Sequence, residues 1–309
     1  MEIRVENLRR HFGRTRAVDG ISFTFHSGQI VGFVGPNGAG KTTTMRILAT
    51  ADEPTAGDAF VDGASVVQDP EKVRSRVGFM PDALPAHRDI SVHEYLDFFA
   101  RAYGVPSGRR RAVVQQVEEF TNLADLRQKT LAALSRGMKQ RVSLARAMVH
   151  DPAVLILDEP ASGLDPRARI ELRELLRVLA ERGKAILISS HILTELSEIC
   201  DATVIIEQGR IVRAGTMAEI AAHDMPHRTV LVRTLGSTED LHKAVLQMPR
   251  VVAARVTGAH VEVDIEGDEE GCQTLLAMLV RQGLPIVEFA CRKTGLEEIF
   301  MTVTKGKVQ

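Results

Sequence analysis

Short apolar runs alternate with longer amphipathic stretches along roughly the first 220 residues of the chain. The runs that predict strands span 3–5, 21–25, 30–34, 77–80, 154–157, 185–189 and 203–207. Helical periodicity follows Lys41 and recurs at 92–103, 109–120, 138–149, 167–181 and 192–199. Strands that alternate with helices predict a mostly parallel sheet covered on its faces. The strands up to residue 25, together with the "FVDG" segment, are instead typical of an antiparallel side sheet.

The hydrophobic pattern changes around residues 221–227, where "AAHDMPHR" predicts a linker broken by Pro226. The elements expected after it are strand 229–233, helix 238–247, strand 251–256, strand 260–265, helix 270–282 and strand 286–292. This β-α-β-β-α-β order is the ferredoxin-like arrangement, and a last helix is expected from Leu296. The predicted fold class is therefore α/β for a domain at 1–222, followed by a small α+β domain at 223–309.

Composition places the chain among ordinary water-soluble globular proteins. Of its 309 residues, 44% are hydrophobic and 26% are charged, and the formal net charge is −1. This balance does not favour nucleic acid as a partner. Its three cysteines show no metal-binding spacing and fit reduced thiols of a cytosolic protein. No run approaches the ~20 apolar residues that span a bilayer, so action at a membrane would require another chain to span it.

The segment "FVGPNGAGKTTT" carries the strongest chemical signal. It has the spacing G-x-x-x-x-G-K-[ST], with the apolar run 30–34 before it and a helix-forming stretch behind. Glycines let successive backbone N–H groups approach phosphate oxygens at the positive end of a helix. The expected nucleotide contacts are Gly35, Pro36, Asn37, Gly38, Ala39, Gly40, Lys41, Thr42 and Thr43. Lys41 would reach the β- and γ-phosphates and Thr42 would ligate Mg²⁺. The alternative is a glycine-rich turn that binds nothing.

A second signal is "AVLILDEP", an apolar run that ends in two consecutive carboxylates, Asp158 and Glu159. The carboxyl end of a buried parallel strand opens at the ligand crevice of such a sheet. Asp158 is therefore suited to bind Mg²⁺, directly or through water. Glu159 is placed to act as a general base on a water molecule aimed at the γ-phosphate. The alternative is a strand that simply ends in surface acids. The phosphate loop upstream makes this alternative much less favoured.

Four segments in order, "GPNGAGKTT", "LSRGMKQRVSLARAM", "LILDEPASGLD" and "ILISSH", together resemble the nucleotide-binding subunits of ABC transporters. The resemblance covers roughly residues 1–220. It implies a P-loop ATPase core with an antiparallel side sheet and a helical signature subdomain, and it implies ATP and Mg²⁺ as cofactors. The C-terminal segment resembles the small domain appended to several exporter-type subunits of that family.

The stretch from Leu134 to Gln140 resembles the family's "LSGGQ" signature, with Arg136 and Met138 replacing glycine and glutamine. The resemblance implies that Ser135 and Gly137 face the γ-phosphate bound by a partner subunit, so the working form is a dimer. Local chemistry agrees, because serine is a good N-cap and a helix N-terminus attracts anions. The side chain at position 136 would either contact phosphate or face solvent.

Three further positions follow from the resemblance. Asp165 in "SGLD" belongs to the family's D-loop, although an N-cap followed by proline already explains its local role. His191 follows the run "AILISS" and matches the switch histidine that donates a hydrogen bond to the γ-phosphate. Phe12 matches the aromatic that stacks on adenine, with His11 as the alternative stacker and a place in the core as the alternative role.

Asp82 departs from the family, which has glutamine at this position after "VGFMP". A shorter, charged side chain can still reach a metal ion, so Asp82 joins Thr42 and Asp158 as a predicted metal ligand. It also adds a third carboxylate near Asp158 and Glu159. By the resemblance, residues 82–92 would form the docking groove for a helix of the permease.

The predicted function is an ATPase that powers transport, with Glu159, His191 and Lys41 as catalytic residues. Two copies would close on two ATP molecules and re-orient a separate polytopic permease, with export favoured by analogy. The subunit would lie peripherally on the cytoplasmic face of the plasma (inner) membrane. The C-terminal domain would serve dimerisation or regulation, and the cargo is not encoded in this chain.

Two alternatives remain open. One is a soluble ATPase of the same superfamily that acts on ribosomes or DNA. The single cassette, the balanced charge and the short distance between phosphate loop and acidic pair argue against it. The other is a regulatory module that holds ATP without turnover, suggested by Asp82, Arg136 and Met138. The presence of Lys41 and Glu159 argues against that.

Overall fold

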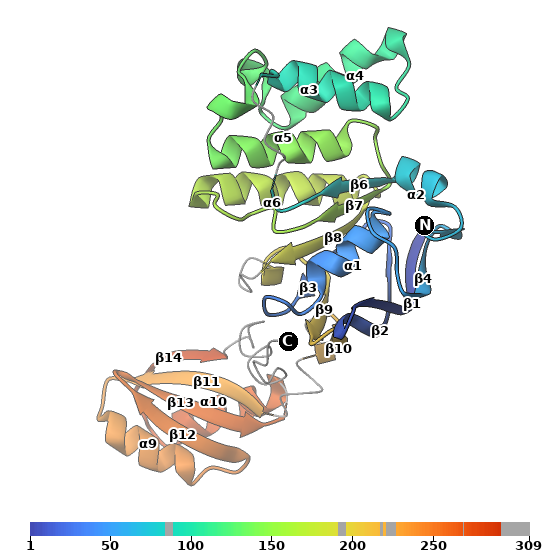
Figure 1. Ribbon diagram of the computed structural model, residues 1–309. Helices are drawn as coiled ribbons and strands as arrows, with labels where there is room; N and C mark the ends of the chain where they lie inside the picture. The colour runs from blue at the N-terminus through green and yellow to red at the C-terminus, as the bar shows by residue number, and fades with distance from the viewer. Residues whose placement is uncertain (84–88, 191–195, 217–218, 221–226, 268, 292–309) are drawn as a thin grey trace. The chain divides into compact units, whose positions relative to one another are not determined.

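The computed structural model describes residues 1–83, 89–190, 196–216, 219–220, 227–267 and 269–291. Contacts between residues divide the chain into two compact units with the boundary after Thr216 (Figure 1). The larger unit holds the phosphate loop and the acidic pair.

The larger unit begins with an antiparallel side sheet, as the sequence predicts. Its strands are β1 (Glu2–Phe12), β2 (Thr15–His26), β4 (Ala56–Val61) and β5 (Ala64–Ser65), in the order β2-β1-β4-β5. β1 and β2 extend well beyond the predicted 3–5 and 21–25, because their outer halves expose polar side chains and lack an apolar run. The hairpin between them turns at Gly13, which has a φ of +59°. This hairpin brings Phe12 and Thr15 next to each other.

A second, mostly parallel sheet forms the centre of this unit, again as predicted. Its strands are β3 (Ile30–Val34), β6 (Val77–Met80), β7 (Val154–Leu157), β8 (Ala185–Ser190), β9 (Ala202–Glu207) and β10 (Arg210–Gly215). Their order is β10-β9-β3-β8-β7-β6. β8 therefore lies between the strand that leads into the phosphate loop and the strand that leads into Asp158. β10 was not predicted, because "RIVRAG" has no sustained apolar run and is only partly buried.

Helices cover this sheet and also form a layer of their own. They are α1 (Lys41–Leu48), α2 (Pro70–Arg76), α3 (Val92–Ala102), α4 (Ser107–Phe120), α5 (Arg136–Met148) and α6 (Pro166–Glu181), with short 3-10 turns η1 (Ala124–Leu126) and η2 (Leu131–Ala133). α3, α4 and α5 lie together in Figure 1 around a separate apolar cluster that includes Tyr95, Leu96 and Val142. This cluster is the predicted helical subdomain. The first half of the predicted helix 192–199 lies outside the described residues, and residues 196–197 are helical.

The smaller unit has the predicted β-α-β-β-α-β order. Its elements are β11 (His227–Thr234), α9 (Thr238–Leu246), β12 (Val251–Thr257), β13 (His260–Glu266), α10 (Glu269–Arg281) and β14 (Ile286–Cys291). The sheet order is β12-β13-β11-β14, and every pair is antiparallel. One face packs on α9 and α10 through buried residues such as Val230, Val263 and Leu275. The predicted helix from Leu296 lies outside the described residues.

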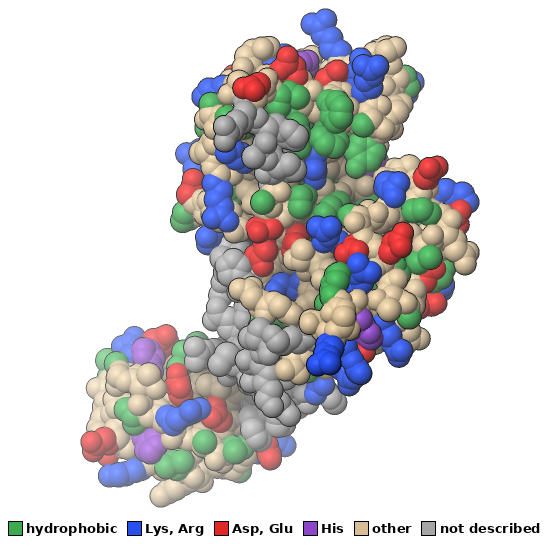
Figure 2. Space-filling model, viewed as in Figure 1, with side chains coloured by type: hydrophobic (Ala, Val, Ile, Leu, Met, Phe, Trp, Pro, Cys, Tyr) green, Lys and Arg blue, Asp and Glu red, His purple; other side chains and the backbone are tan. Residues whose placement is uncertain are grey.

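The distribution of charged side chains on the surface agrees with the formal net charge of −1 (Figure 2). On the face in Figure 2, Lys and Arg side chains are interspersed with Asp and Glu over the larger unit, so neither sign of charge dominates. Among the residues that the structure describes, no helix combines the length and the hydrophobicity required to cross a bilayer.

Candidate functional site

A polar hollow of about 490 Å³ opens where the central sheet and the side sheet meet. Such a volume falls in the roughly 300–1,000 Å³ range of pockets that hold a small ligand. Its lining comes from four segments distant in sequence: Phe12, Thr15, Ala17, Asn37, Gly38, Gly40, Lys41, Thr42, Thr43, Asp82, Asp158 and Glu159. The fold thus brings most of the predicted nucleotide and metal residues into one place. Thr15 and Ala17 were not predicted, because they carry no motif and reach the hollow only through the β1–β2 hairpin.

The phosphate loop joins β3 to α1 along one wall of this hollow. Steric contacts require glycine at two of its positions. A Cβ at Gly35 would lie 2.2 Å from the carbonyl oxygen of Ile206, and one at Gly40 would lie 2.3 Å from that of Ala17. Gly40 also has a φ of +105°, which side chains rarely permit. The loop therefore packs against neighbouring backbone so closely that no larger residue fits.

Lys41 begins α1 and lies within the loop. Its Nζ donates hydrogen bonds to the carbonyl oxygens of Gly35 at 2.7 Å and Pro36 at 3.2 Å. Burial lowers the pKa of Lys41 from its ordinary value, while the carboxylates of Glu159 and Asp158 oppose that shift. The ammonium group is thus held inside the loop, close to the acids that line the opposite wall.

Three predicted loop residues, Gly35, Pro36 and Ala39, do not line the hollow and instead shape the loop from behind. The N–H of Ala39 donates to the carbonyl oxygen of Pro36 at 3.1 Å. The carbonyl oxygen of Ala39 accepts the N–H of Gly209 at 3.0 Å, which ties the loop to the β9–β10 turn. These three residues therefore support the neighbouring loop residues that line the hollow.

The acidic wall follows β7. Asp158 is 1% exposed, and its Oδ1 accepts a hydrogen bond from the hydroxyl of Ser189 at 2.6 Å. The same hydroxyl accepts the backbone N–H of Glu159 at 2.9 Å. Glu159 has a φ of +50°, a left-handed conformation that is uncommon for a residue with a side chain. The chain therefore leaves the strand by a sharp turn at the predicted general base.

The donor atoms in the hollow suit a magnesium ion bound together with phosphate. Thr42, Asp82 and Asp158 offer hydroxyl and carboxylate oxygens, the ligands that Mg²⁺ prefers. Among the described residues, no group of three or more His, Cys, Asp or Glu side chains could hold a metal ion by itself. The oxygen donors of Thr42, Asp82 and Asp158 fit Mg²⁺, which is usually bound by one or two carboxylates together with water and substrate phosphates.

Phe12 stands at the rim of the hollow, with 48% of its surface exposed. The guanidinium of Arg10 lies 4.5 Å from the centre of its ring. The neighbouring His11 is not among the residues that line the hollow, and its Nε2 is 3.6 Å from a carboxylate oxygen of Asp19. Of the two candidate stackers, Phe12 is therefore the one that lines the hollow, and its exposure shows that it does not belong to the core.

Comparisons with known proteins show the family of this chain. The model of the ABC transporter family matches residues 18–162, from β2 through the acidic pair. The chain is 39% identical over 312 residues to the Nod factor export ATP-binding protein I of Paraburkholderia xenovorans, spanning 99% of this chain and 98% of that protein. It is 31% identical over 310 residues to a daunorubicin resistance ATP-binding protein of Streptomyces coeruleorubidus, spanning 98% and 95%. This chain is an ATP-binding subunit of the ABC transporter family.

A solved structure described as the ATP-binding subunit of an ABC transporter shares the fold with this ABC ATPase. It has a TM-score of 0.67 and 29% identity, over 72% of this chain and 93% of that one. The subunit accordingly binds and hydrolyses ATP, with Mg²⁺ as the metal general to such enzymes. Cassettes of this family form dimers and act with membrane permeases.

The signature segment of this ABC ATPase lies apart from the hollow. Ser135 caps α5 as predicted, because its hydroxyl accepts the N–H of Met138 at 3.3 Å. Ser135 and Gly137 are absent from the lining of the hollow. A Cβ at Gly137 would lie 3.3 Å from Leu164, a tight contact between the start of α5 and the D-loop. Within one chain the start of α5 therefore packs on the D-loop, and its signature residues do not line the hollow.

Arg136 is exposed to solvent, which is one of the two roles considered from the sequence, and it also makes a contact that was not predicted. Its Nη2 donates to the hydroxyl of Ser162 at 2.8 Å, and its side chain lies over Gly163, where a Cβ would be 2.5 Å from it. The arginine that replaces the usual glycine thus links the signature segment to the D-loop. Asp165 in that loop caps α6, since its Oδ1 accepts the N–H of Ala168 at 2.8 Å.

A second contact missed from the sequence joins the signature helix to the metal side of the hollow. Gln140 is buried, and its Nε2 donates to the carbonyl oxygen of Asp82 at 3.3 Å.

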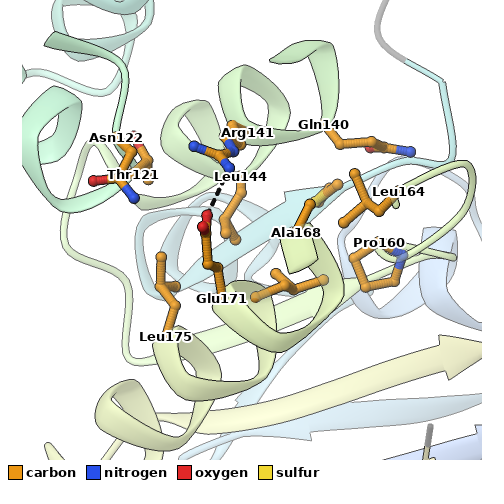
Figure 3. Close-up of a pocket in the computed structure, with 12 residues that line it drawn as sticks. Thr121, Asn122, Gln140, Arg141, Leu144, Pro160, Leu164, Ala168, Glu171 and Leu175 are labelled. Carbon is orange, nitrogen blue, oxygen red and sulfur yellow. Dashed lines mark hydrogen bonds and ion pairs between the residues drawn. The ribbon is translucent and has the colours of Figure 1, made fainter. Parts of the chain in front are cut away.

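In Figure 3, Arg141 of α5 and Glu171 of α6 point toward each other across a small pocket, and their ion pair measures 2.6 Å. At about 50 Å³ this pocket is far too small for a nucleotide. It marks where α5 packs on α6.

Two predictions about the site fall outside the described residues. His191 lies in the segment 191–195, and the part of the predicted docking groove at 84–88 is likewise not described. The structure does place their neighbours. β8 ends at Ser190 beside Val34, which precedes the phosphate loop, and α3 begins after Ser91 in a capping box with Glu94.

Proposed function

We propose that the ABC ATPase works as a homodimer in which each ATP lies between the phosphate loop of one copy and the signature segment of the other. One observation carries this proposal. The hollow gathers Lys41, Asp158 and Glu159, whereas Ser135 and Gly137 of the same chain do not line it. A second copy can supply those two residues, and the N-terminus of α5 then adds its backbone N–H groups to the γ-phosphate.

Nucleotide binding is assigned to residues 35–43 and Phe12. The backbone N–H groups of the loop and the ammonium of Lys41 hold the phosphates, and the ring of Phe12 stacks on adenine. Thr42, Asp82 and Asp158 hold Mg²⁺. The metal, when bound, supplies positive charge that neutralises phosphate oxygens in the transition state.

Hydrolysis is assigned to Glu159 as general base. Its carboxylate accepts a proton from the water that attacks the γ-phosphate. Lys41 and the N–H groups of the loop stabilise the charge of the transferred phosphoryl group. His191 donates a hydrogen bond to the same group; this role is supported by the motif and by the position of β8 next to β3.

The dimer drives a separate polytopic permease from the cytoplasmic face of the inner membrane, where the ATPase lies peripherally. Export is the direction of transport. It is supported by the names of the relatives, one of which exports Nod factors and another of which confers daunorubicin resistance. Those two names refer to different compounds, and we propose that the permease determines which cargo is transported. The domain at 223–309 serves dimerisation or regulation and has no part in the chemistry.

A pull-down tests the partner. Tagged Glu159→Gln protein is incubated with ATP and detergent-solubilised native membranes, and its partners are identified by mass spectrometry. We expect a polytopic membrane protein in stoichiometric amount, lost when Lys41→Ala protein is the bait. Recovery of ribosomal or DNA-associated proteins in place of such a partner would contradict the transporter assignment.

A further inference from the structure

One hydroxyl group connects the two acidic residues of the site. Ser189 lies on β8 and is fully buried, and it received no role from the sequence although it lies within the segment "ILISSH". A backbone N–H can only donate, so the Ser189 oxygen accepts from Glu159 at 2.9 Å. Its own proton then goes to Oδ1 of Asp158 at 2.6 Å. Both hydrogen bonds can therefore form at once, and each polarises the other.

The position of Ser189 follows from the register of the sheet. β7 and β8 are parallel with Leu157 opposite Ile188. The residues that come next, Asp158 and Ser189, therefore meet at the edge where the hollow opens. Ser189 is also two positions before His191 in the sequence.

The backbone of Glu159 requires such a support. A φ of +50° is disfavoured for a residue with a Cβ and persists only where surrounding contacts enforce it. The bond from its N–H to Ser189 is one of those contacts, and the bond from the N–H of Ser162 to the carbonyl oxygen of Glu159, at 3.0 Å, is another. The direction of the Glu159 side chain depends on this turn.

We infer that Ser189 is a positioning residue for ATP hydrolysis: its hydroxyl orients the Asp158 carboxylate toward Mg²⁺ and fixes the turn that aims Glu159 at the attacking water. The inference rests on the proposed roles of Asp158 and Glu159. Ser189 itself does not line the hollow. Without the hydroxyl, Asp158 loses a charge-assisted hydrogen bond inside the protein and Glu159 is free to leave its left-handed conformation.

The test compares Ser189→Ala with Ser143→Ala. Ser143 is an equally buried serine, on α5, whose hydroxyl has no hydrogen-bond partner among the described residues. Both variants lose one buried hydroxyl, so they share any general effect on packing. For each protein we would measure the melting temperature, the affinity for ATP with Mg²⁺ and with EDTA, and kcat over a range of Mg²⁺ concentrations.

We expect Ser143→Ala to behave as the wild type. Ser189→Ala should bind ATP normally in EDTA, lose most of the gain in affinity that Mg²⁺ provides, and need about tenfold more Mg²⁺ for half-maximal activity. Its kcat should fall by roughly tenfold or more, and Ser189→Thr, which keeps the hydroxyl, should restore both properties.

Two results would overturn the inference. One is a Ser189→Ala protein with the Mg²⁺ dependence and kcat of Ser143→Ala. The other is a Ser189→Thr protein as impaired as Ser189→Ala, which would assign the effect to packing. Glu159→Gln is measured alongside. If that variant keeps wild-type turnover, the assignment of the general base fails, while the Mg²⁺ readout still tests the contact between Ser189 and Asp158.

Discussion

Replacing Glu159 by glutamine lowers ATP turnover by roughly 10²–10⁴-fold, because the amide cannot accept a proton from the attacking water. The substitution keeps the size of the side chain and the backbone turn, whose N–H still donates to Ser189. ATP binding is therefore preserved, and the bound nucleotide stays uncleaved. Phosphate release and a nucleotide-binding titration on the purified protein measure the two effects separately.

The matched control is Glu181→Gln, which makes the same change at an exposed position at the end of α6. It should leave turnover and binding unchanged. Wild-type turnover in Glu159→Gln would exclude Glu159 as the base. A simultaneous loss of binding would instead indicate that the carboxylate holds the loop together, which is a structural role.

Replacing Lys41 by alanine weakens ATP binding by roughly 10–100-fold, since the ammonium makes charge-assisted contacts with phosphate that alanine cannot replace. Lys41 is 7% exposed and bonds to the carbonyl oxygens of Gly35 and Pro36, so the loop also loses an internal brace. The expected signature is a higher dissociation constant, in contrast to the selective loss of turnover in Glu159→Gln. Isothermal titration with ATP and Mg²⁺ measures it.

Lys72→Ala provides the control for loss of a lysine. Lys72 is exposed on α2 and pairs only with Asp69 among the contacts that the structure describes. Its removal should not change ATP affinity. Wild-type affinity in Lys41→Ala would contradict the assignment of the phosphate loop, whatever the effect on hydrolysis.

The sequence predicts the fold well wherever burial makes a strand apolar along its whole length. β3, β6 and β7 have the predicted bounds, since each is a continuous apolar run on both faces of a covered sheet. β10 and the outer halves of β1 and β2 escape prediction because they bury too few side chains to require a continuous apolar run. The order of elements in the smaller unit was predicted from the same alternation of strands and helices.

The motif residues of the site could also be predicted, but the contacts that hold them could not. The phosphate loop and the acidic pair are local patterns, and their meeting follows from the parallel order of the strands. The bonds from Ser189 to Asp158, from Gln140 to Asp82 and from Arg136 to Ser162 join residues 26 or more positions apart. Serine, glutamine and arginine are common residues, so only the three-dimensional structure identifies the ones that make these contacts.

The central claim is that each ATP site contains residues of two copies, and mixing two inactive variants tests it most directly. Lys41→Ala disables the phosphate loop, and Ser135→Asp places a carboxylate next to the phosphate while keeping a good N-cap for α5. Ser237→Asp makes the same exchange at the N-cap of α9, in the smaller unit, and should leave activity unchanged. Each disabled variant alone should be nearly inactive in ATP hydrolysis.

In a mixed dimer one site carries both substitutions and the other carries neither. Equal mixing should therefore restore about a quarter of wild-type ATPase activity, because half of randomly formed dimers are mixed and each has one intact site. Recovery to that level would support the shared site. A mixture that stays as inactive as its components, under conditions where exchange of subunits is verified, would contradict it.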